Sequence, residues 1–203
     1  MQLSASASIL PLSPVVPARI RKAATVAMTR VAWDVREGLM QGMQSSFDRP
    51  NPWTMRAWRV APAGLTADGN IEAVVYAAPS QARYLFWQVE GGERNTKGFE
   101  RRMNLFGGEV AIPTRNAKLD QYGNVNLSTI KRMSSDKDKR FFVGRPKGGD
   151  RPEGVWLRSR HRLYMVMAFE DSASYKPRLD VPGISQGVVS RSFRSQILRA
   201  LSA

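Results

Sequence analysis

A long amphipathic segment near the N-terminus limits what this chain can fold into more than any other feature. From Pro17 to Gln44, apolar side chains recur at spacings of three and four residues. At about 100° per residue they fall on one narrow face of a helix, and Pro17 suits a helix start. Gly38 and Gly42 extend this face, so we expect the second half of the helix to approach another element closely. The apolar residues that define the face are Ile20, Ala24, Ala27, Val31 and Val35.

The rest of the chain alternates short extended segments with shorter helices. Asp68-Gly69 lies between two apolar runs and predicts a β-hairpin, whereas residues 82–92 fit a short helix or a strand. A second amphipathic helix is expected from Ile184 to Leu201. Because the helices do not alternate with the strands one by one, we predict an α+β fold, with the long N-terminal helix and the C-terminal helix packed on a mostly antiparallel sheet. Three further strands are expected at 140–146, 154–159 and 162–170.

The sequence predicts one domain that is preceded by an arm. Residues 1–17 contain Pro11, Pro14 and Pro17 and are expected to be extended, either as a disordered tail or as an arm that docks on a neighbouring subunit. Residues 18–203 are expected to form a single α+β domain with a long basic loop region at about 91–140. The sequence contains no apolar run of about 18 residues, so we expect no membrane-spanning helix.

Composition excludes several classes of chemistry. The 203 residues include no Cys and one His, so thiolate catalysis, sulfur-ligated metals and paired histidines are excluded. His161 lies among arginines, and no Gly-x-Ser-x-Gly pattern surrounds a serine. We therefore expect no catalytic residue, no metal, no cofactor and no enzyme activity. Lys and Arg number 31 against 17 Asp and Glu, and this net charge of +14 favours polyanions or acidic proteins as partners.

The segment AKLDQYGNVNLSTI, residues 117–130, has oxygen-bearing side chains at alternate positions, as calcium loops do. However, counted from Asp120 as position one, its glycine is at position four rather than six, and no Glu closes the loop. The pattern instead predicts a turn in which Gly123-Asn124 takes positive φ, followed by a short helix capped by Asn126 or Ser128. The predicted turn residues are Asp120, Tyr122, Gly123 and Asn124.

Aromatic and basic residues suggest two kinds of contact surface. Trp33 and Met40 lie off the apolar face of the N-terminal helix, where they fit either intrachain packing or a subunit interface. We predict an interface formed by Trp33, Met40, Trp53 and Trp58. The basic residues show no sequence-reading motif, which leaves a diffuse affinity for phosphates. The predicted basic contact residues are Arg94, Lys97, Arg101, Arg102, Lys131 and Arg132.

Several segments together resemble a family of virion proteins. The segments are FDRPNPWT, FERRMNLFG, AKLDQYGN, RFFVGRP and GVWLR, followed by a closing helix. Between residues 18 and 201 the chain resembles the minor tail or tail-completion proteins of tailed bacteriophages and prophages, the group of the lambda minor tail protein Z. FDRPNPWT and AKLDQYGN are the most specific of these segments.

The resemblance implies a non-enzymatic structural protein of the head–tail junction or proximal tail. Such a protein would form a homo-oligomeric ring with portal, adaptor or tail tube subunits around the DNA path, without a membrane. It would be assembled in the host cytoplasm and reside in the neck or tail of the virion. From charge alone, the alternative is a basic protein that contacts nucleic-acid phosphates non-specifically.

Overall fold

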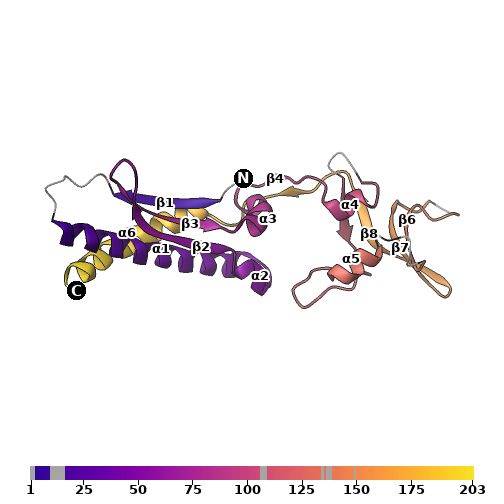
Figure 1. The fold of residues 1–203 in the computed structure, drawn as a ribbon. Helices are drawn as coiled ribbons and strands as arrows, with labels where there is room; N and C mark the ends of the chain where they lie inside the picture. Colours follow the sequence, from indigo (N-terminus) through magenta and orange to yellow (C-terminus); the bar gives the residue numbers. More distant parts are fainter. Residues whose placement is uncertain (1–2, 10–16, 106–108, 134, 136–138, 149) are drawn as a thin grey trace. The chain divides into compact units, whose positions relative to one another are not determined.

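The chain forms two compact units, which Figure 1 shows in a computed structural model that describes residues 3–9, 17–105, 109–133, 135, 139–148 and 150–203. Unit 1 comprises Met1–Glu90 and Pro177–Ala203, and unit 2 comprises Gly91–Lys176. Unit 2 is thus an insertion in the sequence of unit 1. This division differs from the single domain expected over residues 18–203, whereas the α+β fold class is confirmed.

Helix α1 (Ala18–Ser46) forms as its apolar spacing predicted. It begins directly after Pro17 and ends where Phe47 becomes extended. From Ala23 onward, the apolar face is buried against β2, β3 and α6, whereas Ile20 at the first turn remains 41% exposed. The buried residues of this helix are Ala23, Ala24, Ala27, Met28, Val31, Ala32, Val35, Leu39 and Met43.

A three-stranded antiparallel sheet covers α1. Its strands are β1 (Ser4–Ile9), β2 (Trp58–Leu65) and β3 (Ile71–Ala77), in the order β1-β3-β2. The predicted hairpin joins β2 to β3, with Gly69 at φ 78°. Alternate residues of the central strand, from Ile71 to Ala77, are buried over α1, so β3 is the strand that links the sheet to the helix layer.

The N-terminal arm is only in part what the sequence predicted. Residues 4–9 are extended, as expected, and they form a strand rather than a disordered tail. They pair with β3 of the same chain in a register that runs from Ser4 opposite Tyr76 to Ile9 opposite Ile71. Residues 10–16 of the predicted arm lie outside the described residues.

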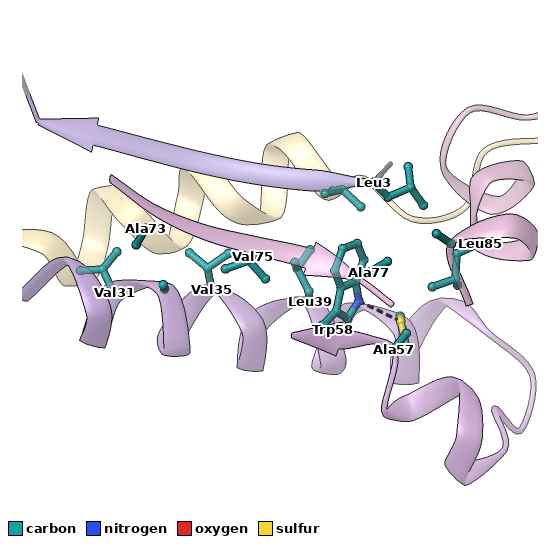
Figure 2. Close-up of a cluster of buried hydrophobic side chains, with 14 of the residues drawn as sticks. Leu3, Val31, Val35, Leu39, Ala57, Trp58, Ala73, Val75, Ala77 and Leu85 are labelled. Atoms are coloured by element: carbon teal, nitrogen blue, oxygen red, sulfur yellow. Dashed lines mark hydrogen bonds between the residues drawn. The ribbon is translucent and has the colours of Figure 1, made fainter. Parts of the chain in front are cut away.

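Two short helices complete one end of unit 1. Helix α2 (Pro52–Met55) is capped by Asn51, whose side chain accepts a hydrogen bond from the Thr54 amide at 2.8 Å. The ambiguous segment 82–92 lies largely in helix α3 (Pro79–Val89). Figure 2 shows the core that these elements enclose, in which Leu85 of α3 and Trp58 of β2 lie beside residues of α1 and β3.

Helix α6 (Val181–Leu201) closes unit 1 and begins three residues earlier than the predicted Ile184 start. The Asp180 side chain accepts a hydrogen bond from the Gly183 amide at 2.9 Å, so the cap lies upstream of the apolar stripe. The helix packs along α1, where a Cβ atom at Gly38 would lie 2.8 Å from Val188 Cγ2. The close approach predicted for Gly38 and Gly42 is therefore confirmed, and α6 is the element that makes it.

Unit 2 contains a second antiparallel sheet in the order β5-β8-β7-β6 and a two-stranded pair, β4-β9. Its core gathers Met103, Leu105, Ala111, Met133, Val155, Val166 and Met167. The predicted long basic loop region at 91–140 was wrong in part, because this range holds β4, α4, β5 and α5. The elements of unit 2 are β4 (Gly92–Glu93), α4 (Gly98–Arg101), β5 (Val110–Pro113), α5 (Leu127–Met133), β6 (Phe141–Gly144), β7 (Gly154–Ser159), β8 (Arg162–Glu170) and β9 (Ser174–Tyr175).

The glycine contact between α1 and α6 can be tested with two matched alanine substitutions. Gly187→Ala, in α6, meets only the flexible end of Arg191 and should raise the free energy of unfolding by about 0.5–1 kcal/mol through helix propensity. Gly38→Ala should lose that gain and lower the free energy of unfolding, because its methyl group meets Val188. Urea unfolding of both variants measures the difference. Equal stabilisation by the two substitutions would contradict the packing described here.

Candidate interaction surfaces

Trp33 is the predicted interface residue that the structure leaves most exposed. It lies on α1 away from the buried face, and 51% of its surface is accessible. The Arg36 guanidinium lies over its ring, 5.5 Å from the ring centroid, and Arg36 Nε donates to the Trp58 carbonyl at 3.1 Å. The indole is therefore held in place beside a cation and remains available to a partner.

Trp53 forms a second exposed aromatic position in unit 1. It is 45% accessible and stacks on Tyr84, with ring centroids 5.6 Å apart. Its backbone carbonyl accepts a hydrogen bond from the Gln81 side chain at 3.2 Å, which ties α2 to α3. Met40, by contrast, is partly buried against the core of unit 1, so a share of its surface already serves intrachain packing.

Trp58 was predicted as an interface residue, and that prediction was wrong. Its side chain is fully buried in the core of unit 1, and its indole Nε1 donates to Met43 Sδ at 3.1 Å (Figure 2). Trp58 opens β2, where the alternation of the strand turns it towards α1. A tryptophan at a strand start serves core packing as readily as an interface, so residue type alone could not separate the two roles.

Arg94 was predicted as a basic contact residue, and that prediction was also wrong. Its side chain is 8% accessible and forms a bidentate ion pair with Glu100, which is fully buried. The Arg94 Nη1–Glu100 Oε2 distance is 2.8 Å, and the Nη2–Oε1 distance is 2.6 Å. The charge of Arg94 is thus neutralised inside unit 2 and is not presented to a partner.

Glu100 is a structurally central residue that sequence reasoning missed. Its carboxylate also accepts hydrogen bonds from the amides of Lys97 and Ala111, which joins the start of α4 to β5. Burial alone would raise the pKa of Glu100, but the hydrogen bonds from Arg94, Ala111 and Lys97 outweigh it and lower the pKa. A signal was present in the sequence, since Glu100 occupies the third residue of a helix whose first turn it caps.

The other predicted basic contact residues lie on the surface of unit 2. Lys97, Arg101 and Arg102 are exposed around α4. Lys131 and Arg132 are exposed in the last turn of α5, and the Arg132 guanidinium lies 5.3 Å from the Phe141 ring centroid. A further arginine that the sequence analysis did not select is Arg158, which lies 4.4 Å from the centroid of the Phe142 ring. Unit 2 therefore carries several exposed cations, and two of them lie over aromatic rings.

The predicted turn at Asp120 is a tight hairpin. Asp120 Oδ1 accepts from the amides of Tyr122 and Asn124, each at 2.9 Å, and the Gly123 amide donates to the Asp120 carbonyl at 3.0 Å. Gly123 has a φ of 77°, as predicted, whereas positive φ is not found at Asn124. The Asn126 side chain accepts a hydrogen bond from the Ser128 amide at the start of α5. Of the two predicted caps, Asn126 and Ser128, the structure therefore shows Asn126.

A cavity of about 720 Å³ in unit 2 does not resemble a phosphate site. Its described lining residues include Arg102, Lys139 and Arg158, but also Glu109 and Glu170. Walls of both signs do not concentrate one kind of ion. Within the described part of the chain, no group of three or more His, Asp or Glu side chains is placed to hold a metal, and no helix there has the length and apolar character of a membrane span.

Comparisons of the chain with protein-family models, curated proteins and solved structures gave no match. The resemblance to phage tail proteins therefore rests on the sequence segments themselves.

The buried ion pair predicts a strong and pH-dependent effect on stability. Glu100→Gln leaves the Arg94 charge buried without a counter-charge and should lower the free energy of unfolding of unit 2 by about 3–5 kcal/mol. Glu93→Gln, at an exposed position nearby, is the matched control and should change stability by about 0.5 kcal/mol or less. Chemical unfolding monitored on unit 2 measures both.

The sign of the pH dependence follows from the lowered pKa of Glu100. The unfolded chain binds the proton at the ordinary carboxyl pKa of 4.5, and the folded chain binds it only at lower pH. The stabilisation is thus complete above the unfolded pKa and is lost as pH falls through the folded value. Glu100→Gln should remove this loss of stability at acid pH. An unchanged dependence of the free energy of unfolding on pH below 4.5 would contradict the role of Glu100.

Proposed function

We propose that this protein is a non-enzymatic structural protein of a tailed-phage virion, placed at the head–tail junction or the proximal tail. In this proposal it assembles as a homo-oligomeric ring that contacts portal, adaptor or tail tube subunits. The observation that carries the proposal is the exposed Trp33 held beside Arg36 on the outer face of α1. Tryptophan and arginine are the residue types most enriched where protein contacts carry binding energy.

The two most specific segments of the resemblance support an assembly role through their shape. FDRPNPWT, residues 47–54, runs from the C-cap of α1 into the first turn of the capped helix α2, and it exposes Trp53 beside Tyr84. AKLDQYGN forms the hairpin that the Asp120 carboxylate closes. The side chains of this segment are largely exposed. Both segments are largely exposed and held in shape by local hydrogen bonds, as contact sites between subunits require.

The direct test is the composition of purified particles. Phage or prophage particles that carry this gene should contain the protein at a fixed stoichiometry after density-gradient purification, as measured by quantitative mass spectrometry. A protein that stays free in the lysate while complete particles lack it would overturn the proposal.

The contact role of Trp33 can be separated from folding by comparing two tryptophans. Trp33→Ala should change the free energy of unfolding by about 0.5 kcal/mol or less, because the side chain is half exposed, yet it should reduce incorporation into particles. Trp58→Ala should cost about 3–5 kcal/mol, because it empties the core of unit 1. For both variants, the amount of protein incorporated into particles is compared with the free energy of unfolding. Normal incorporation of Trp33→Ala would remove this residue from the interface.

The basic surface of unit 2 supports the alternative, a protein that binds nucleic-acid phosphates non-specifically. In that case the affinity of the purified protein for DNA should fall steeply with salt, and the triple substitution of Arg101, Arg102 and Lys131 by Ala should reduce the slope of log K against log salt by about 2–3. Arg94→Ala is not a suitable probe, because it would break the buried ion pair. An unchanged slope would exclude these three residues as phosphate contacts.

A further inference from the structure

The two edges of the unit 1 sheet are built differently. Edge strand β2 carries Arg59, Pro62 and a register irregularity between Ala61 and Gly64, all of which discourage pairing with a further strand. Edge strand β1, SASASI, has no proline, no charged residue and no irregularity in its register with β3. The β2 edge is therefore protected against pairing with a further strand, whereas the β1 edge has none of these protective features.

Strand β1 is held by few side-chain contacts. Ala5 and Ala7 are half-buried, Ser4, Ser6 and Ser8 are exposed, and Leu3 just before the strand is the large apolar side chain that enters the core (Figure 2). A cavity of about 420 Å³ lies between β1, β3, α1 and α6, because the alanines do not fill the space above the helices. The attachment of β1 thus depends mainly on its backbone pairing with β3.

The central strand β3 nevertheless needs a partner at this edge. Every second residue of β3 is buried, and the backbone groups on its β1 side would be unpaired if β1 left. A site that must be filled, and a terminal strand that is weakly anchored, are the conditions under which identical chains exchange an element. The same contacts then form between chains as within one chain.

The sequence that follows β1 favours such an exchange. Eight residues, LPLSPVVP, separate Ile9 from Ala18, the first residue of α1, and three of them are proline. Proline restricts its own backbone and that of the preceding residue to extended conformations, so the composition of this segment favours a long reach over a tight turn. At about 3.3 Å per residue, eight residues can span at most about 26 Å.

We propose that residues 4–9 are exchanged between copies of this chain, so that β1 of one copy pairs with β3 of its neighbour in the register seen here. The occupant is a second copy rather than a different protein, because the site already fits this strand along its whole length. The contact itself adds no charge repulsion between two copies, because β1 is uncharged and the described residues that line the cavity are all uncharged. The exchange deepens the proposed ring assembly and rests on it for its biological role.

The absence of cysteine in the chain allows a direct cross-linking test. Ser6 and Val74 are opposite each other in the β1–β3 register. Full-length protein with Ser6→Cys is mixed with differently tagged full-length protein with Val74→Cys, incubated at high concentration and oxidised. We expect a disulfide-linked heterodimer whose yield rises with protein concentration, identified by mass spectrometry of the joined peptides. The matched control replaces Val74→Cys by Leu65→Cys, an exposed position on β2, and should give no such heterodimer.

A single chain that carries both Ser6→Cys and Val74→Cys tests whether β1 pairs within its own chain. If this double variant forms only an intrachain disulfide and the mixture forms no heterodimer, β1 stays on its own chain and the proposal is overturned. A second register pair, Ser8→Cys with Glu72→Cys, repeats the test, and failure of both double variants to form any disulfide would overturn the register itself. Because these reactions use purified protein without particles, a heterodimer obtained from a protein that is absent from virions would refute the virion role and leave the exchange intact.

Discussion

The buried face of α1 is the constraint on which the rest of unit 1 depends. The three-stranded sheet packs on it through β2 and β3, and α6 packs along it. Thr29 and Arg36 add polar ties, because Thr29 Oγ1 accepts from the Ala63 amide at 3.0 Å and Arg36 donates to the Trp58 carbonyl. Gly38 and Gly42 let the last helix of the chain lie against the first long one. The core of this unit is therefore completed by residues 177–203, which supply the buried Leu179 and Val181.

The packing of α6 on α1 constrains how unit 2 is inserted. Unit 2 lies between α3 and α6 in the sequence, so the two points at which the chain leaves and re-enters unit 1 have to lie close together. In unit 1, the Gln88 carbonyl accepts from the amides of both Arg178 and Leu179, at 2.7 and 3.0 Å. In unit 2, β4 and β9 pair antiparallel at its two sequence ends. Each unit thus closes its own ends with backbone hydrogen bonds, as insertion of one compact unit into another requires.

Long periodic elements could be predicted from the sequence, and roles set by distant partners could not. The stripe of α1, the Asp68-Gly69 hairpin and the Gly123 turn follow from local spacing and turn chemistry. Trp58 and Arg94 were assigned by residue type, and both are buried because of partners, Met43 and Glu100, that only the folded chain brings into contact. The insertion was missed for the same reason. Its closing strands have two residues each, too few for a periodic signal.

Net charge limits how copies of this chain can meet. Lys and Arg outnumber Asp and Glu in both units, so each unit carries a net positive charge that repels an identical copy. At physiological salt, screening acts beyond about 8 Å, so surface charges closer than this still repel. Contacts through uncharged backbone pairing or aromatic side chains, as the β1 edge and Trp33 would provide, add no further charge repulsion between copies. The surplus positive charge would in turn be left for a different partner, either DNA in the lumen of the proposed ring or an acidic neighbouring protein. In such an assembly, binding that polyanion and bringing the copies together would reinforce each other, because each phosphate or carboxylate bound between two subunits removes part of their repulsion.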